Sequence, residues 1–550
     1  MRPIFLPPLL ACLAALPLIF AGGFQNLSAF FLRTQDSWLL LVAALIALAA
    51  TWRIEQRCAP LTARRDVRVI ALLLVLVCYA GHHLLLAGYA MSRDEQMALF
   101  DAGIFASGRL VAPLPDIWVA HAEALNTLFM LPVEHPVAWV SSYLPMNAVL
   151  HAPLGALAGP LLVGLGAIAL HGCARTLWPS RPEAWLVALL LYLASGQILI
   201  TGMTSYAMTA HLALNLVWLW LFLQRRTGTD LGALAVGFVA TGLHQPIFHP
   251  LFAAPILVLL LTEKTWRRAA LFAAGYAAIC LFWLLWPGWM VGLVAGPDSV
   301  PAARGVDYLT RLVDVVRAGD SARLANMVAN LLRFIAWQPI MLLPLVALAR
   351  PVIRRGGLPA ALAWGAALPV VVTLVVLPYQ GHGFGYRYLH GVIGSLILLA
   401  VYGWIELGER LPLWRAAMVR VTLAGLAVLL PIQAWMAHGF YAPFARVSAA
   451  IDRSGADYAI VGAEDAPFVQ DLVINRADLS NRPIRLLAEQ VDGLVIEQIC
   501  RSGAAAVLVS DARLADIARY FGQEPEGDAD TRNASLAPRL EAAGCRVTII

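Results

Sequence analysis

Long apolar runs alternate with short polar segments from the start of this chain to about residue 437. A helix needs roughly 17–25 residues to cross the hydrocarbon core of a bilayer. About thirteen runs meet or approach this length, at approximately residues 4–22, 37–52, 68–90, 148–171, 184–201, 206–223, 231–247, 249–262, 269–287, 326–349, 357–378, 390–408 and 417–437. The pattern predicts a mainly α fold, a polytopic bundle of about 13 transmembrane helices.

The basic residues between these runs predict the orientation of the bundle, because lysine and arginine are enriched in cytoplasmic loops. In this layout five groups of basic residues fall on one side, which we expect to be cytoplasmic. They are Arg53, Arg57, Arg64, Arg65 and Arg68, then Arg225 and Arg226, then Lys264, Arg267 and Arg268, then Arg350, Arg354 and Arg355, then Arg410, Arg415 and Arg420. The other side receives the loops at 91–147, 288–325 and 379–390, and everything after about residue 438.

The sequence changes character after Phe440. Short apolar segments separated by polar stretches predict strands at Tyr458–Gly462, Gly493–Ile496, Ala505–Ser510 and Cys545–Ile550, and helices at Pro483–Gln490 and Ala512–Phe521. We therefore expect a small extracytoplasmic α/β domain at 438–550, a transmembrane domain at 68–437 and two further membrane helices at 1–67. Cys500 and Cys545 share the outer compartment in this layout, where a disulfide and unpaired burial are both open.

Composition supports a membrane protein, since 60% of the 550 residues are apolar and only 13% are charged. The formal net charge of +5 arises largely in short loops between apolar runs. No basic stripe with interleaved aromatic residues is present, so nucleic acid is not an expected partner.

The first candidate site is the segment Ser92–Gln96, which follows directly on an apolar run. Charged side chains at the mouth of a membrane segment are costly and for that reason often functional. Asp94 and Glu95 would point about 100° apart on a helix, so one carboxylate can act as a general base while the other holds a hydroxyl, a water or a metal. The alternative is a helix N-terminus capped by Ser92, with acidic residues in the first turn.

The second candidate site is the segment 379–390, which contains three glycines at alternate positions and Arg387. Glycines let the backbone approach a ligand closely, and a guanidinium group suits phosphate. His382 and Tyr388 lie within the same segment. An aromatic anchor at the membrane surface is the alternative.

A third candidate is the proline-interrupted junction around His244 and His249. Their spacing of five residues differs from the i, i+4 spacing of a helical metal pair, although the prolines loosen that argument. A kinked connection between helices remains equally open.

The residues of the first outer loop resemble those of the GT-C class of polytopic glycosyltransferases, which includes protein O-mannosyltransferases and aminoarabinose transferases. The resemblance lies in Arg93-Asp94-Glu95-Gln96, in the downstream segment Asp101–Gly108, and in Tyr143-Leu-Pro145 before the next membrane run. It implies a polyprenyl-phosphate sugar as donor and an acidic residue of the first loop as base, which here is Asp94 with Glu95 in support.

We therefore expect a glycosyltransferase of the bacterial inner membrane that transfers a hexosyl or pentosyl group from a polyprenyl-phosphate carrier to an acceptor of the cell envelope. Arg387, His382, Tyr388 and Arg93 are the expected binders of the donor phosphate. The sequence leaves open a divalent metal near Glu95. It also leaves open three other functions: a flippase or transporter of lipid-linked glycans, a glycan polymerase or ligase, and a structural assembly protein.

Overall fold

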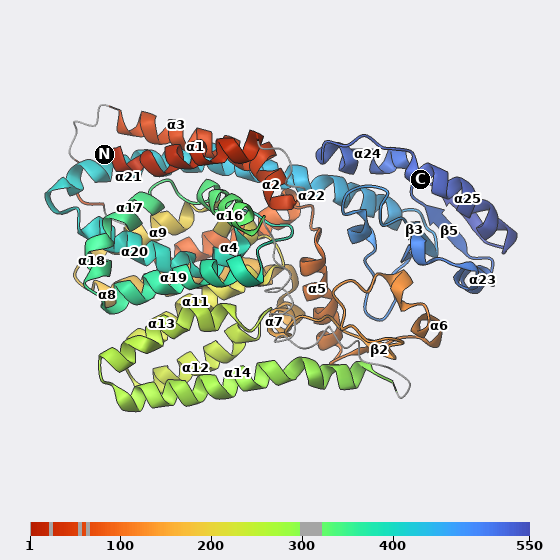
Figure 1. Ribbon diagram of the computed structural model, residues 1–550, viewed down its shortest axis with the longest axis horizontal. Coiled ribbons are helices and arrows are strands. Elements are labelled where there is room, and N and C mark those ends of the chain that lie inside the picture. The colour runs from red at the N-terminus through yellow and green to blue at the C-terminus, as the bar shows by residue number, and fades with distance from the viewer. Residues whose placement is uncertain (1, 21–25, 53–57, 62–65, 297–321) are drawn as a thin grey trace. The chain divides into compact units, whose positions relative to one another are not determined.

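The computed structural model describes residues 2–20, 26–52, 58–61, 66–296 and 322–550 (Figure 1). Arg53, Arg57, Arg64, Arg65 and most of the 288–325 loop lie outside this range. The chain divides into two compact units. Unit 1 holds the described residues of 1–81, 156–284 and 308–436, and unit 2 holds those of 82–155, 285–307 and 437–550. The domain boundaries expected from the sequence stay predictions.

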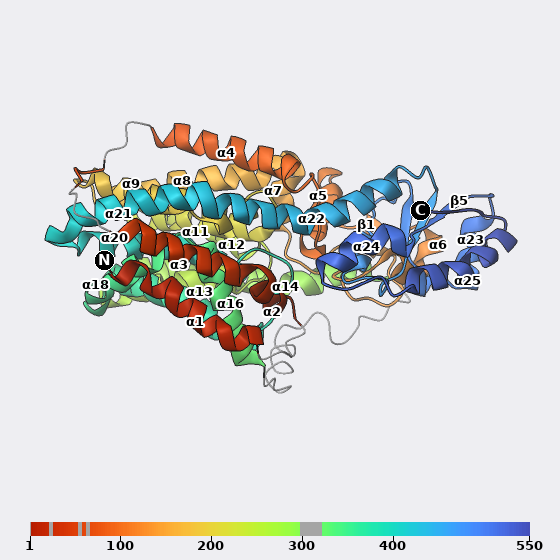
Figure 2. The same cartoon turned by 90° about the horizontal axis from the view of Figure 1, so that it is seen from above.

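Helices form nearly all of unit 1. They are α1 (Leu6–Phe20), α2 (Leu27–Phe31), α3 (Ser37–Thr51), α8 (Ala158–Leu177), α9 (Pro182–Leu193), α10 (Gly196–Thr201), α11 (Ala207–Leu223), α12 (Thr227–Thr241), α13 (Phe248–Thr262), α16 (Arg323–Trp337), α17 (Leu342–Leu348), α18 (Arg350–Arg354), α19 (Gly357–Val376), α20 (Ile393–Ile405) and α21 (Leu411–Ala424). Three further helices, α4 (Val67–Leu84), α14 (Trp266–Val294) and α22 (Leu430–Asp452), have residues in both units. Helices α11, α12 and α13 pack on one another (Figure 1), and α1 and α3 lie side by side (Figure 2).

Helices occupy most of each of the apolar runs named above. Within the described residues, seven helical segments are long and apolar enough to cross a membrane, or up to eight if the bent pair α16 and α17 forms one span. Four shorter apolar helices, α1, α9, α11 and α13, accompany them. Large side chains such as Leu72, Leu76 and Leu285 are exposed on these helices, as lipid-facing residues are. A multi-pass membrane fold is thus confirmed, and the number of thirteen crossings stays a prediction.

A buried ion pair fixes the N-terminal segment within unit 1. Asp36, just before α3, accepts hydrogen bonds from Arg333 Nε over 2.8 Å and from Trp337 Nε1 over 2.7 Å. Both charged side chains are only 1% exposed. Arg333 also donates to the carbonyl of Gly383 over 2.8 Å. One guanidinium group therefore connects α3, α16 and the segment that carries Arg387.

Unit 2 combines the segment 91–147 with the C-terminal region. Its elements are α5 (Arg93–Ala106), β1 (Ala112–Pro113), α6 (Asp116–Val119), β2 (Ala138–Trp139), α7 (Met146–Leu154), β3 (Tyr458–Val461), β4 (Ile484–Leu487), α23 (Gly493–Cys500), β5 (Ala505–Leu508), α24 (Asp511–Tyr520), α25 (Asp528–Ala542) and β6 (Arg546–Ile549). The helix N-terminus that the sequence allowed at Ser92 is the start of α5. Between residues 116 and 125 the loop forms only α6 and the 3₁₀ helix η3 (Ala122–Leu125).

The C-terminal strands form one parallel sheet in the order β4-β3-β5-β6. The expected strands at Tyr458, Ala505 and Cys545 and the helix from Ala512 are confirmed. Two other predictions were wrong. Residues 484–487 form a strand, because they pair with β3 at the sheet edge, and residues 493–500 form a helix, because the Asp492 side chain accepts from the Val495 N–H and caps it.

The loop and the sheet share one hydrophobic core. Met97 and Phe100 of α5 and Trp139 of β2 belong to the same buried cluster as Ile460 and Leu508 of the sheet. Trp139 Nε1 also donates to the carbonyl of Ala477 over 2.8 Å. The acidic start of α5 is therefore positioned by the C-terminal region.

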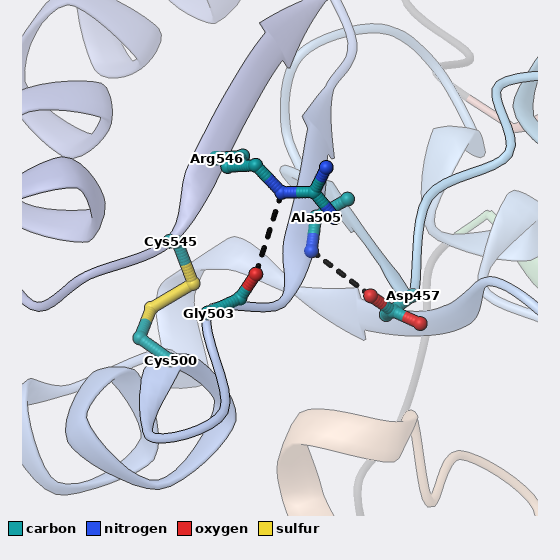
Figure 3. Close-up of a disulfide and its surroundings, with 6 residues drawn as sticks. All are labelled: Asp457, Cys500, Gly503, Ala505, Cys545 and Arg546. Carbon is teal, nitrogen blue, oxygen red and sulfur yellow. Dashed lines mark hydrogen bonds between the residues drawn. A yellow bond between two sulfur atoms is a disulfide. The ribbon is translucent and has the colours of Figure 1, made fainter.

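A disulfide joins Cys500 at the end of α23 to Cys545 before β6 (Figure 3). Next to it, Arg546 Nε donates to the carbonyl of Gly503, and Ala505 N donates to Asp457 (Figure 3). Of the two states that the sequence left open for these cysteines, the structure contains the bonded one. The five cysteines outside this pair are free.

Candidate active site

Helix α5 begins with a capping box formed by Ser92 and Glu95. The Ser92 hydroxyl accepts from the Glu95 N–H, and the Glu95 carboxylate accepts from the Ser92 N–H, each over 3.4 Å. The motif S-x-x-E satisfies backbone N–H groups that have no partner inside the helix. The capping interpretation of the acidic pair therefore holds for Glu95.

Glu95 is held by more than the cap. Its Oε2 atom also accepts from the Met91 N–H over 3.3 Å and from the Tyr441 hydroxyl over 2.7 Å, and the residue is 1% exposed. These bonds tie α22 to the start of α5. No group of three or more His, Cys, Asp or Glu side chains within the described residues is arranged to hold a metal ion. The bonds around Glu95 are those of a capping carboxylate, and a metal near Glu95 stays a prediction.

Asp94 is the acid of the pair that reaches solvent, since it is partly exposed while Arg93, Glu95 and Gln96 are buried. Its Oδ1 atom accepts a hydrogen bond from the Tyr143 hydroxyl. Tyr143 in turn stacks on Phe129 with ring centroids 5.8 Å apart. The N-terminus of α5 favours negative charge at this position. Asp94 is thus an oriented carboxylate that a substrate can approach.

Arg93, an expected phosphate binder, points into the protein. Its guanidinium group donates to Gln96 Oε1 over 3.1 Å and to the carbonyls of Asn126, Leu128 and Val473 over 2.8, 3.0 and 3.4 Å. Burial lowers the pKa of Arg93 to about 10, so it remains charged at neutral pH. Because it is 4% exposed and holds backbone carbonyls, its geometry favours a role in positioning the loop. Phosphate binding by Arg93 stays a prediction.

Asp101, two turns along α5, is a buried carboxyl to which the sequence assigned no role. It accepts from the Ser141 hydroxyl over 2.5 Å and from the Ser141 N–H over 3.0 Å. Burial raises its pKa to about 7, while the two hydrogen bonds from Ser141 oppose the rise. Segment 141–143 therefore contacts both acids, Asp101 through Ser141 and Asp94 through Tyr143.

Replacing Asp101 with asparagine should remove a pH dependence of stability. The native carboxyl keeps a proton that the unfolded chain loses near pH 4, so stability falls between about pH 4 and pH 7, by on the order of 4 kcal/mol. Asparagine can make both bonds to Ser141 without charge. Thermal unfolding of the full chain in detergent should show D101N more stable than wild type at pH 8 and little changed near pH 4. Exposed Asp116→Asn is the control, and an unaltered pH dependence in D101N would contradict the assignment.

The glycine-rich segment of unit 1 is folded tightly around Arg387. The Gln380 side chain donates to the Gly385 carbonyl over 2.8 Å and accepts from the Arg387 N–H over 2.9 Å. Gly383 and Gly385 have φ angles of 143° and 64°, and a Cβ at Gly383 would lie 2.4 Å from Arg387 Cδ. Glycine is required there by both backbone conformation and space.

Arg387 begins the 3₁₀ helix η5 (Arg387–Val392) and is 6% exposed. Its guanidinium carbon lies over the rings of Tyr206 and Tyr388, at 5.1 and 5.8 Å from their centroids. Together with His211 and Asn215 it lines a small cavity of unit 1. A buried cation beside a cavity can bind an anionic group that enters it.

The other residues expected around this site are placed as follows. His382 is buried. Tyr388 stacks on Phe248 at 5.4 Å and donates to the Tyr379 carbonyl over 3.3 Å. His211 was not among the predicted site residues. It is 3% exposed, and its two ring nitrogens lack a hydrogen-bond partner within the described residues. Its position in a mostly apolar helix offered no local signal.

His249 and His244 differ in their surroundings. His249 is fully buried, its Nδ1 donating to Asn215 over 2.7 Å and its Nε2 accepting from the Tyr276 hydroxyl over 2.6 Å. Asn215 also donates to the Gly391 carbonyl over 2.9 Å, so this chain of bonds supports η5. His244 is 9% exposed. The geometry favours a structural role for His249, and a ligand role for either histidine stays a prediction.

Neither the family models nor the curated proteins compared with this chain give a match. Among solved structures, the chain is similar to ArnT from Cupriavidus metallidurans. For ArnT bound to undecaprenyl phosphate the identity is 14% and the TM-score 0.45, with 87% of this chain and 89% of that chain covered. For ArnT in the apo state the identity is 12% and the TM-score 0.46, with 86% and 88% covered. Because both TM-scores lie below 0.5, no conclusion about activity rests on this similarity.

Proposed function

We propose that this chain is a membrane glycosyltransferase of the GT-C type, which transfers a sugar from a polyprenyl-phosphate carrier to a hydroxyl of a cell-envelope acceptor. The observation that carries the proposal is the state of Asp94. Of the two adjacent acids, Glu95 is used in the helix cap, whereas Asp94 reaches solvent and is oriented by Tyr143. An oriented carboxylate at a helix N-terminus that solvent can reach suits a general base.

The reaction follows from the roles of two side chains. Asp94 removes the proton of the acceptor hydroxyl as its oxygen attacks the anomeric carbon of the sugar. The bond between this carbon and the phosphate oxygen breaks, and the polyprenyl phosphate leaves with the bonding electrons. Arg387 stabilises the charge that develops on the departing phosphate. Asp94 then releases the proton to water.

The proposal places the reaction on the outer face of a bacterial inner membrane. The basic loops support that orientation through the positive-inside rule. The disulfide between Cys500 and Cys545 supports it as well, because such bonds persist in oxidising compartments. The proposal includes both a hexosyl and a pentosyl group as the sugar that is transferred.

Replacing Arg387 with alanine should mainly weaken donor use. The loss of a charge-assisted contact to phosphate corresponds to roughly 1.5–3 kcal/mol, or about a 10- to 100-fold rise in the donor KM. The acceptor KM should change far less. Steady-state transfer by the purified protein, with an undecaprenyl-phosphate sugar as donor, measures both constants.

Two variants serve as controls for this experiment. Arg387→Lys keeps the charge but loses the planar fork, so its donor KM should lie between those of wild type and R387A. Arg225→Ala removes an arginine from an exposed ion pair with Glu263 and should leave the donor KM unchanged. A wild-type donor KM in R387A would refute the phosphate clamp.

A further inference from the structure

Unit 2 contains an open cavity that none of the roles above uses. Its volume is about 650 Å³, which lies within the range of about 300–1,000 Å³ typical of small-molecule sites. Its walls come from residues between 114 and 139 of the first outer loop and from Gln470 and Leu487 of the C-terminal region. We call it the first-loop cavity.

The wall of this cavity is held in an unusual conformation. Asn126, Phe129 and His135 line it with φ angles of 64°, 67° and 53°, in the left-handed region that non-glycine residues rarely adopt. Arg93 fixes this wall by donating to the carbonyls of Asn126 and Leu128, and Asn126 donates to the Gln470 carbonyl over 2.9 Å. Strained backbone that is held by such contacts is often found at ligand sites.

A short path links the cavity to the candidate base. Phe129 lines the cavity and stacks on Tyr143, and the Tyr143 hydroxyl donates to Asp94. Arg93, the residue before Asp94, holds the same wall. A molecule bound in the cavity would therefore lie one aromatic ring away from the side chain that orients the base.

The chemistry of the lining selects among ligands. Leu128 and Phe129 are 42% and 41% exposed, so the cavity offers apolar surface to a ligand. Its charged side chains are the two carboxylates of Glu123 and Glu134, and no lysine or arginine is among these lining residues. Glu123 accepts from the Thr127 hydroxyl over 2.7 Å. Such a lining repels a phosphate and attracts an ammonium group.

We propose that the first-loop cavity binds the acceptor, and that the acceptor is an amphiphile with an apolar body, a free hydroxyl and an amine. The proposal rests on the proposed glycosyltransferase function and assigns the second substrate of the same site. The apolar body contacts Leu128 and Phe129. The amine lies near Glu123 and Glu134, and the hydroxyl extends toward Asp94.

A matched pair of probes tests this assignment. Sphinganine carries a long apolar chain, hydroxyls and an amine, and sphinganine 1-phosphate adds a negatively charged phosphate to the same body. The full chain in detergent should bind radiolabelled sphinganine at least 10-fold more tightly than its phosphate ester. In the double variant Glu123→Gln/Glu134→Gln, sphinganine binding should weaken about 5- to 10-fold, and the preference for it should be largely lost.

The two glutamates are exposed, so the double variant should fold. Glu263→Gln, whose side chain lies in another unit, is the matched control and should bind both probes as wild type does. Equal binding of the two probes by wild type, or unchanged binding in the double variant, would overturn the assignment.

A second readout separates this proposal from the function on which it rests. The KM for the polyprenyl-phosphate donor should be unchanged in the double variant. If the wild-type protein transfers sugar from the donor, but the double variant binds sphinganine as tightly as wild type does, the cavity assignment fails. The proposed transferase function is then unaffected. If sphinganine binds as expected but no polyprenyl-phosphate sugar is used, the proposed function fails and the cavity remains a site for amine-bearing amphiphiles.

Discussion

Replacing Asp94 with asparagine should lower kcat for sugar transfer by about 10²- to 10⁴-fold, the usual contribution of a general base. Asparagine has nearly the same shape, and its side-chain oxygen can still accept from the Tyr143 hydroxyl. The fold of α5 should therefore survive, since its cap depends on Ser92 and Glu95. Transfer rates of purified D94N at saturating donor and acceptor measure the effect.

Two further variants test whether the loss of activity in D94N comes from the missing carboxylate of Asp94. Asp116→Asn removes an exposed acid from the first turn of α6 and should leave kcat unchanged. Tyr143→Phe keeps the stacking on Phe129 but loses the bond to Asp94, so kcat should fall by less than in D94N. Full activity of D94N would refute the base. It would favour the glycan polymerase or ligase alternative, in which arginine and histidine residues act without an acid.

The second large effect is expected at the buried ion pair of unit 1. Asp36→Ala leaves the Arg333 guanidinium buried without its carboxylate, which costs about 3–5 kcal/mol. Glu263→Ala, which breaks an exposed pair, should cost at most about 1 kcal/mol. Thermal or denaturant unfolding in detergent compares the two variants, and equal stability would contradict the importance of the buried pair.

A double substitution separates stability from function at this pair. Asp36→Leu with Arg333→Met replaces both charges by apolar side chains and should recover most of the stability. It cannot restore the bond from Arg333 to the Gly383 carbonyl, which supports the Arg387 segment. The donor KM of the double variant should therefore stay raised. A wild-type donor KM would show that Arg333 has no part in positioning Arg387.

The same pair bears on the flippase alternative. A flippase or transporter would need charged residues well inside its helices, and Arg333 lies inside an apolar run. In the structure this guanidinium is bonded to Asp36 and to the Gly383 carbonyl and is 1% exposed. A guanidinium held by these bonds and shielded from solvent favours a structural role over a place on a substrate path.

Local patterns in the sequence predicted the elements well. The apolar runs are helical, and the motif around Ser92 forms the capping box that its spacing indicates. The two errors have different causes, one a tertiary contact and one a local helix cap. Residues 484–487 lack a clear strand pattern and become a strand through pairing with β3. Residues 493–496 are apolar enough for a strand, but the Asp492 cap favours a helix.

The roles within the candidate site depend on partners far away in the sequence. The contacts that favour a structural role come from Tyr441, 346 residues after Glu95, and from Val473, 380 residues after Arg93. The spacing Ser92-x-x-Glu95 already indicates Glu95 as the capping acid, but it does not show the burial of Glu95 or its bond to Tyr441. The sequence located the acidic pair, and only the folded chain shows which acid a substrate can reach.

The anomeric configuration of the product tests the central claim most directly. If Asp94 acts as a base in a single displacement, the acceptor oxygen attacks the face opposite the departing phosphate, and the configuration inverts. The wild-type protein forms the glycosylated product from a donor of known configuration. Proton NMR then measures the anomeric configuration of this product. The account predicts inversion. Retention, which requires a covalent glycosyl intermediate or another mechanism, would contradict it.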